Sequence, residues 1–251
     1  MRRLMNLAVL IFIIATIFQN NSIVVKKYDI LESDIRIVQL SDLHTKSFGE
    51  NNSLLIDKVK RLNPDVITIT GDLIDGSNID FIYIANTVKQ LNDIAPVLFI
   101  LGNNDMWSNE VEMIIEVVEL SGGLFLNNES INIKGVNFFG HNPYYNYSNV
   151  KNSMKKLSNL NKELVLLTHQ PEKIDNFSDY YFDLVLSGHT HGGQIRVPLI
   201  GAIIAPDQGT FPKYDKGLYE LENCTLIVSS GLGNSIIPIR IFNAPEIILI
   251  T

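Results

Sequence analysis

The sequence predicts an α/β fold in which two packed sheets carry helices on their outer faces. Strand-length runs of β-branched and aliphatic residues recur along the chain, and stretches with apolar residues at spacings of three and four separate the early ones. This alternation is typical of β-α-β units whose sheet is buried on both faces. Beyond about residue 124 the pattern changes to shorter strands and turns, without an internal repeat. A chain of 251 residues that is 46% hydrophobic is long enough for one large domain with a substantial core.

The amino terminus is strongly apolar. Arg2 and Arg3 precede a nearly uninterrupted apolar run from Leu4 to Phe18. As a helix this run would be about 22 Å long, short of the roughly 30 Å hydrocarbon core of a bilayer, and residues 23–25 could extend it. A cleaved secretory signal and a buried helix are alternatives. An uncleaved anchor is favoured because no small-residue cleavage site follows the run and no polar face recurs within it.

We therefore divide the chain into a signal anchor or transmembrane segment at residues 1–26 and a domain at residues 27–251. Two arginines and the α-amino group precede the span, whereas Lys26 and Lys27 follow it. The more positive side of a span stays in the cytoplasm, so this balance places the domain on the extracytoplasmic side of a single N-terminal span.

Strands and helices follow in order along the domain. Five main strands are expected at residues 35–40, 66–70, 97–101, 164–168 and 184–187. Helices are expected at residues 53–62, 79–91 and 110–120, where the first two connections end in Pro64 and Pro96 before a strand. Shorter strands are expected at residues 124–126, 130–133, 136–139, 218–221, 225–229 and 246–250.

The charge balance excludes one class of partner. The chain has 20 Lys and Arg against 27 Asp and Glu, a formal net charge of −7, and no run of basic residues longer than two. We expect no nucleic-acid binding surface, because such surfaces neutralise phosphates with clustered cations. A phosphate substrate remains compatible with this charge, because bound metal ions can invert the charge of a pocket.

Residues of metal-ligand type follow each of the five main strands directly. Open α/β sheets place their ligand crevice at the carboxyl ends of strands, so these loops can converge on one place. Four of the five histidines of the chain lie in them. The candidate ligands are Asp42, His44, Asp72, Asn103, His169, His189 and His191.

This donor set exceeds what one tetrahedral ion requires. It mixes oxygen and imidazole nitrogen and contains no thiolate, since the single cysteine, Cys224, precedes a strand elsewhere. Such a set suits two divalent or trivalent ions bridged by a carboxylate, with Mn, Fe and Zn all acceptable.

The ordered motifs Asp-x-His, Gly-Asp, Gly-Asn-Asn-Asp, His and Gly-His-x-His resemble those of the calcineurin-like metallophosphoesterases. The later segments Gly192-Gly193-Gln194 and Asn243-Ala244-Pro245 are similar to the membrane-anchored bacterial branch, which contains YaeI, YkuE and UDP-2,3-diacylglucosamine pyrophosphohydrolase-like enzymes. The resemblance implies a four-layer α-β-β-α sandwich. It also implies one ion held by Asp42, His44 and His191, a second held by Asn103, His169 and His189, and Asp72 between them.

The chemistry implied by the resemblance is cleavage of a P–O bond by attack of a metal-activated hydroxide. The sequence departs from the family at Asn104, where a histidine normally helps to protonate the leaving group. Asparagine donates a hydrogen bond but no proton at neutral pH, and this loss could cost about a hundredfold for poor leaving groups. Asn104 and the neighbouring Asp105 are the candidate catalytic residues, although Asp105 could equally serve to fix its loop.

Three further residues are candidates for substrate contact. His141 could touch substrate or replace the missing acid, but an exposed loop position without such a role is the favoured interpretation. Arg196 and Arg240 could hold a phosphate with two hydrogen bonds, and pairing with a structural carboxylate is at least as common.

Three functions are compatible with these features. The favoured one is a dinuclear-metal phosphodiesterase or pyrophosphatase, acting on a phosphoester or pyrophosphate that could be lipid-linked or part of the cell envelope. A phosphomonoesterase of the same fold is the second, and it would need an acid that Asn104 does not supply. The third is a catalytically weak metal-binding scaffold.

Overall fold

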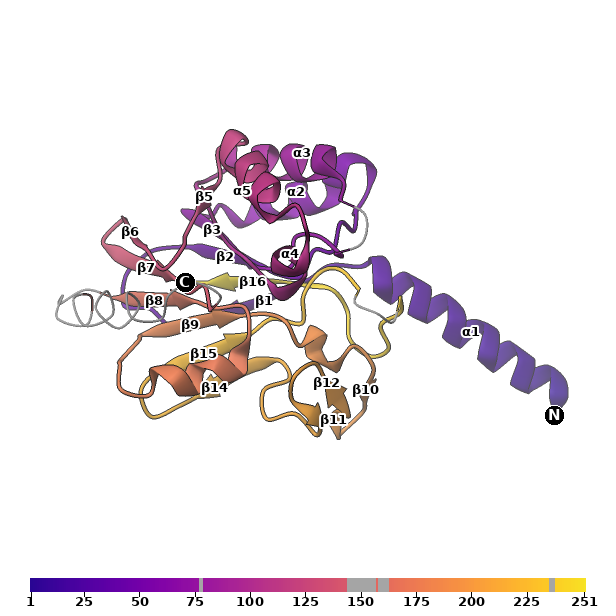
Figure 1. Cartoon of the computed structure of the whole chain (residues 1–251). Coiled ribbons are helices and arrows are strands. Elements are labelled where there is room, and N and C mark those ends of the chain that lie inside the picture. The colour runs from indigo at the N-terminus through magenta and orange to yellow at the C-terminus, as the bar shows by residue number, and fades with distance from the viewer. Residues whose placement is uncertain (77–78, 144–156, 158–162, 235–237) are drawn as a thin grey trace.

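A computed structural model describes residues 1–76, 79–143, 157, 163–234 and 238–251. Two six-stranded sheets lie face to face (Figure 1). The first has the order β1 (Val24–Tyr28), β16 (Glu246–Ile250), β2 (Ile37–Leu40), β3 (Val66–Thr70), β4 (Val97–Ile100) and β5 (Leu124–Phe125). The second has the order β14 (Gly217–Glu220), β15 (Thr225–Val228), β9 (Leu184–Ser187), β8 (Leu164–Leu167), β7 (Val136–Gly140) and β6 (Ser130–Ile133).

Parallel pairing dominates the centre of both sheets. β2, β3, β4 and β5 run parallel, and so do β15, β9, β8 and β7. The carboxyl ends of β2, β3 and β4 therefore lie at one edge of the first sheet, and those of β8 and β9 lie at one edge of the second.

Helices cover the outer face of the first sheet. These are α2 (Ser53–Leu62), α3 (Phe81–Asn92) and α5 (Val111–Leu120), whereas the 3-10 helix η2 (Pro171–Phe177) packs on the second sheet (Figure 1). The short elements are η1 (Glu50–Asn52), α4 (Asn103–Trp107), η3 (His191–Gly193), β10 (Arg196–Val197), β11 (Gly201–Ala202), β12 (Ile204–Ala205) and β13 (Gly209–Thr210).

Alternate residues of the central strands enter different cores. In β4, Leu98 and Ile100 pack between the two sheets, whereas Phe99 packs beneath the helices. In β8, Val165 likewise lies between the sheets and Leu166 lies under η2. Both faces of these strands are thus buried, which explains their continuous apolar sequences. The predicted α/β fold, with two packed sheets and helices outside, is confirmed.

The expected elements are all present, with ends displaced by a few residues. The helix expected from residue 79 begins at Phe81, because the Asp80 side chain accepts a hydrogen bond from the Tyr83 N–H and caps it.

One strand lies where the sequence predicts part of the apolar span. Val24–Tyr28 form β1, parallel to β16 at the sheet edge, so the expected extension of the span over residues 23–25 is wrong. The β-branched Val24 and Val25 suit an edge strand whose Lys26 and Lys27 face solvent. The division proposed between residues 26 and 27 falls inside this strand.

The amino-terminal helix α1 (Arg2–Asn21) projects from the domain (Figure 1). By length and composition it could cross a membrane, a property it shares with secretory signal sequences. Only Thr16 and Asn20 of this helix are buried. The Asn20 side chain accepts from the Arg240 N–H and donates to the Arg240 carbonyl, both at 2.8 Å, so the helix end is fixed to the domain.

Candidate metal centre

The seven predicted ligands lie together at the carboxyl ends of β2, β3, β4, β8 and β9. Each of them is at most 8% exposed, although all are polar or charged. Buried polar groups need partners, and these residues are one another's partners.

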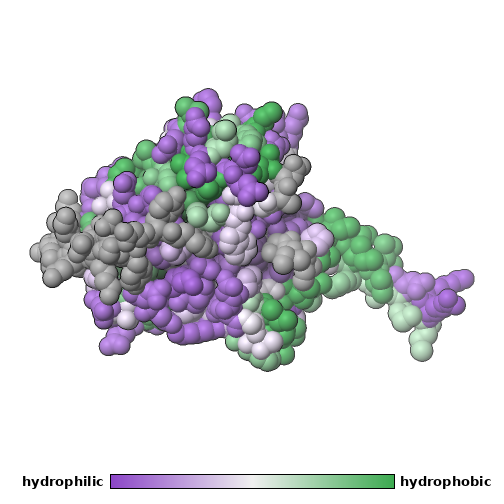
Figure 2. All heavy atoms as spheres, in the orientation of Figure 1, coloured by the Kyte–Doolittle hydropathy of each residue, from purple (hydrophilic) through white to green (hydrophobic). Residues whose placement is uncertain are grey.

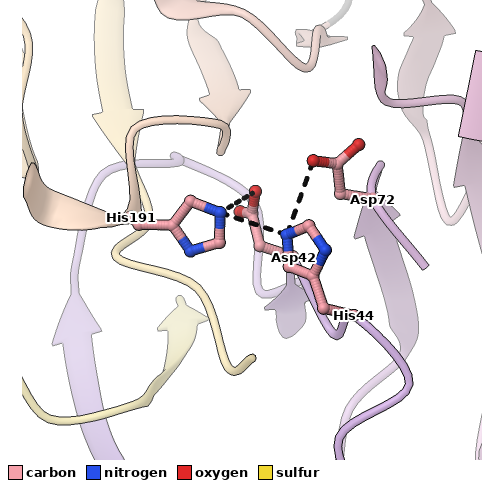
Figure 3. A group of neighbouring side chains, drawn as sticks. All are labelled: Asp42, His44, Asp72 and His191. Carbon is pink, nitrogen blue, oxygen red and sulfur yellow. Dashed lines mark hydrogen bonds and ion pairs between the residues drawn. The ribbon is translucent and has the colours of Figure 1, made fainter. Parts of the chain in front are cut away.

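Four of them form one group (Figure 3). Each of Asp42, His44, Asp72 and His191 offers a ligand atom, and these atoms lie within 4.8 Å of one another. His44 Nε2 is 3.1 Å from His191 Nε2 and 3.5 Å from Asp72 Oδ2. His191 Nε2 is 3.6 Å from Asp42 Oδ1.

The remaining three ligands lie on the other side of Asp72. His169 Nε2 is 3.1 Å from Asn103 Oδ1 and 3.2 Å from His189 Nδ1. The same Asp72 Oδ2 that faces His44 also lies 3.5 Å from His169 Nε2. Asp72 therefore stands between the two groups, where the resemblance placed it.

The backbone at the site is strained in five of these seven positions. Asp42, His44, Asp72, His189 and His191 all have φ between 46° and 71°. Such left-handed conformations are uncommon for residues other than glycine and cluster at functional sites. These backbone conformations direct the side chains into the site and lower the free energy of unfolding.

Two glycines make room for the carboxylates. A Cβ on Gly102 would lie 2.2 Å from Asp72 Oδ1, and a Cβ on Gly188 would lie 2.5 Å from Asp42 Oδ2. Any larger residue at either position would displace a ligand.

Partners outside the ligand set hold two imidazoles in orientation. His169 Nδ1 lies 2.8 Å from the Thr70 carbonyl, to which only a protonated nitrogen can donate, so its Nε2 faces the site. His189 Nε2 lies 3.0 Å from Asp207 Oδ2, which leaves Nδ1 facing the site. Partners of this kind fix the tautomer of metal ligands.

Sequence reasoning missed Asp207, because it lies in a turn outside every motif. It also accepts from Gln170 Nε2 at 2.8 Å. Glu172 completes a second group of possible ligand atoms with Asp207 and the outward nitrogen of His189. Burial raises the pKa of Glu172.

The charged groups of the site shift one another's pKa values. Burial raises the pKa of Asp42, and Asp72 adds to this effect. Burial alone would also raise the pKa of Asp72, but His169, His44 and the Asn104 N–H outweigh it and hold that pKa below its usual range. Burial opposes protonation of His169, yet Asp72 and Asp42 raise its pKa to about 10. The two carboxylates thus stabilise a positive charge in the site, here that of protonated His169.

Two of the other imidazoles at the site, those of His189 and His191, resist protonation. Burial and the charge of His169 lower the pKa of His189 to about 4. Burial, His44 and Arg240 lower the pKa of His191 well below its ordinary value. Neutral imidazole is the form that binds metals.

This donor set fits metal ions. Two imidazole nitrogens that face each other at 3.1 Å, between two buried carboxylates, present converging lone pairs that a cation satisfies. The mixture of nitrogen and oxygen without sulfur suits divalent ions such as Mn, Fe or Zn.

Asn104 and Asp105 both lie beside Asp72, in α4. The Asn104 N–H donates to Asp72 Oδ1 at 2.8 Å and its amide Nδ2 donates to Oδ2 at 2.6 Å. Asp105 is buried and accepts from the N–H groups of Gly102, Leu73 and Ile74. Burial and the Asp72 charge raise the pKa of Asp105 to about 7. These contacts match the loop-fixing role that the sequence left open for Asp105.

The candidates for substrate contact have protein partners. His141 is 1% exposed, so the expected exposed loop position is wrong. It directly follows β7, its N–H donates to the Leu167 carbonyl at 2.8 Å, and its Nδ1 lies 3.1 Å from Thr168 Oγ1. Arg196 Nη1 pairs with Asp215 at 2.7 Å, the structural pairing considered above. Arg240 is fully buried, donates to the carbonyls of Ser230 and Gly233, and places Nη2 3.3 Å from His191 Nδ1.

Comparison with known proteins gives the same family as the sequence motifs. The profile of the calcineurin-like phosphoesterase family matches residues 35–193, which contain all seven candidate ligands. The chain is 32% identical over 231 residues to the uncharacterized metallophosphoesterase Cj0846 of Campylobacter jejuni, covering 88% of this chain and 59% of that protein. It is 30% identical to YkoQ and to YkuE of Bacillus subtilis, uncharacterized metallophosphoesterases, over 85% and 86% of this chain and 82% and 78% of theirs.

The chain therefore spans less than two thirds of the Campylobacter relative's length. Among solved structures, TT1561 of Thermus thermophilus superposes with a TM-score of 0.50 at 13% identity, over 80% of this chain and 91% of that one. At this identity the match concerns the fold alone.

Proposed function

The chain belongs to the calcineurin-like phosphoesterase family, as its strand-end motifs predicted, and from this premise we propose that it is a metal-dependent phosphodiesterase or pyrophosphatase. The observation that carries the proposal is the group of four buried candidate ligand atoms within 4.8 Å of one another. Three further candidates flank this group, and one of them, His169, lies 3.5 Å from the same Asp72 oxygen that faces His44.

Two ions would divide the ligands. Asp42, His44 and His191 would hold one, Asn103, His169 and His189 the other, and Asp72 would contact both. When bound, such ions supply positive charge for the phosphoryl oxygens and lower the pKa of a water molecule.

Side chains and backbone groups around the site orient its candidate ligands. The Thr70 carbonyl and Asp207 each hold one ring nitrogen of His169 and His189, so that the other nitrogen is directed at the position of an ion. Asp105 fixes three backbone N–H groups and so keeps the loops after β3 and β4 in register. Asn104 presents an amide donor next to Asp72. This donor can stabilise a phosphoryl oxygen but cannot protonate a leaving group.

The missing proton donor favours particular substrates. An alkoxide leaving group needs a proton as its bond to phosphorus breaks, whereas a phosphate or an acidic alcohol does not. Pyrophosphates and activated diesters therefore suit Asn104 better than alkyl monoesters do.

We also propose that α1 is an uncleaved anchor that holds the domain at the extracytoplasmic face of a membrane. Its apolar length and the two arginines that precede the run support this orientation. A substrate carried by a lipid or an envelope precursor would then lie close to the site.

The test compares bis-p-nitrophenyl phosphate with p-nitrophenyl phosphate, using the full chain in detergent, stripped of metal and then supplied with Mn²⁺. We expect turnover of the diester that requires metal and is lost in Asp72→Asn, while Asp57→Asn, an exposed change on α2, retains it. Faster turnover of the monoester would favour a phosphomonoesterase. Two bound metals without turnover of either compound would favour a metal-binding scaffold.

A further inference from the structure

Six large apolar side chains are exposed together beside α1. They lie on the two small hairpins β10–β11 and β12–β13 and on the segment before β16, and 38% to 109% of each is exposed. Figure 2 shows apolar atoms gathered there and along α1. Residues 197–206 contain no polar or charged side chain. We name this the hairpin surface, formed by Val197, Leu199, Ile200, Ile204, Phe211 and Phe242.

The backbone holds three of these side chains outward in a strained conformation. Leu199, Phe211 and Phe242 have φ values of 71°, 53° and 51°. Leu199 occupies the third position of a turn closed by the Ile200 N–H and the Val197 carbonyl at 3.1 Å, where glycine or asparagine is preferred. Both the strain and the exposure of a bulky side chain are unfavourable in water, so this surface indicates an apolar partner.

The position of the hairpin surface relative to α1 identifies that partner. The rings of Phe242 and Phe12 lie 6.5 Å apart, and the Asn20–Arg240 pair fixes the helix end. Phe12 precedes the end of the helix by nine residues, about 13 Å along its axis. A helix of 20 residues is about as long as the hydrocarbon core is thick, so Phe12 would lie deep in one leaflet if α1 spans it.

The Phe242 ring would then enter the same leaflet. The strand β10 lies next to it, since the Arg196 N–H donates to the Ile241 carbonyl at 3.0 Å, so the hairpins would lie close to the headgroups. The charged residues next to the hairpins have protein partners: Arg196 pairs with Asp215 at 2.7 Å, and the half-exposed Asp207 lies 3.0 Å from His189 Nε2 and accepts from Gln170 Nε2. A contact at the depth of the headgroups would keep the Arg196–Asp215 ion pair and leave the Asp207 carboxylate within reach of water.

We propose that the hairpin surface inserts into the lipid leaflet next to α1 and forms a second membrane contact, an inference that rests on the proposed anchoring by α1. The catalytic domain is then held against the bilayer in one orientation. Because Asp207, in the same hairpin segment, contacts His189, the metal centre would lie near the level of the lipid headgroups.

The test places single tryptophans in the full chain, in which the native Trp107 is replaced by Phe, and reconstitutes it in phosphatidylcholine vesicles with brominated acyl chains. The reporters are Leu199→Trp on the hairpin surface, Phe12→Trp within α1, and Ile82→Trp, an exposed position on α3. We expect bromine to quench at least about half of the emission from positions 12 and 199 and to leave position 82 nearly unchanged, because contact quenching requires immersion in the acyl region.

The outcomes separate this inference from the anchoring of α1. Quenching at position 12 without quenching at position 199 would leave the anchor intact and refute the second contact. No quenching at either position would refute both. Blue-shifted but unquenched emission at position 199 would mean that protein, such as a second copy of the chain, covers the surface, and this would also refute the lipid contact.

Discussion

Replacing Asn104 by histidine tests the account of catalysis most directly. The backbone N–H of residue 104 is held by Asp72 Oδ1 at 2.8 Å, a contact that any side chain allows, so a histidine would start from the same position. The side chain would then lie where the Asn104 amide now meets Asp72 Oδ2. A protonated imidazole at this position supplies the acid that the native chain lacks.

The size of the effect depends on the leaving group. General acid catalysis contributes about a hundredfold or more when the departing oxygen is basic and little when it is p-nitrophenolate. We expect Asn104→His to raise kcat/KM about a hundredfold for an alkyl diester and by only about threefold for bis-p-nitrophenyl phosphate. The gain should be present at low pH and decline as pH rises above the pKa of the introduced imidazole.

A series of aryl methyl phosphates with increasingly basic leaving groups provides the assay. The logarithm of kcat/KM should fall steeply with leaving-group pKa in the native chain and shallowly in Asn104→His. Asn104→Gln, which keeps an amide without a transferable proton, should retain the steep slope. Equal slopes for all three proteins would refute the assignment of a missing general acid to this position.

Three further predictions concern the supports of the site. Asp207→Asn should weaken metal binding by about 10- to 100-fold, measured by competition with a chelator, because the Asp207 carboxylate that orients His189 is lost. Gly102→Ala should destabilise the protein by about 1–3 kcal/mol in urea unfolding and reduce its metal content, because the added Cβ overlaps Asp72. Burial and Lys173 lower the pKa of His141 to about 4 in the folded protein. In the unfolded chain this histidine takes up a proton below about pH 6.5, before the native state does. The free energy of unfolding should therefore fall as the pH is lowered from about 6.5 to 4. His141→Gln should remove up to about 3 kcal/mol of this loss, and equal pH dependence of the two metal-free proteins would contradict the prediction.

The strand-end motifs predicted that the candidate ligands lie close together, because each of them follows a buried parallel strand within a few residues. A continuous apolar run such as Val66–Thr70 fixes where the strand ends, and parallel pairing brings the next residues to one edge. What the residues alone could not show is the left-handed backbone at Asp42 and Asp72, since aspartate adopts this conformation more often than most residues but still only in a minority of cases. The packing of the whole loop imposes that conformation.

Two predictions, the extension of the span and the exposed position of His141, were wrong for a common physical reason. Val24 and Val25 continue an apolar segment, so hydropathy alone assigns them to the span, but their backbone hydrogen bonds come from β16, more than 200 residues later in the chain. His141 resembles a loop residue because glycine precedes it and proline follows closely, yet it directly follows β7 and its N–H donates to the Leu167 carbonyl of β8. Both errors concern contacts between residues far apart in sequence, which periodicity does not report.

The part of the chain after the last ligand supports the metal centre although it supplies none of the seven ligands. Asp207 holds His189 of one ligand group, and Arg240 lies against His191 of the other. The segments that carry these two residues also expose Leu199 and Phe242, and the Phe242 ring lies 6.5 Å from that of Phe12 in α1. Asp207 and Arg240, which contact the two ligand groups, are therefore carried by the same segments as the surface that we propose to contact lipid. If that contact orders the hairpins, the metal affinity of the full chain should be higher in vesicles than in detergent, and Leu199→Glu should remove the difference while leaving affinity in detergent unchanged.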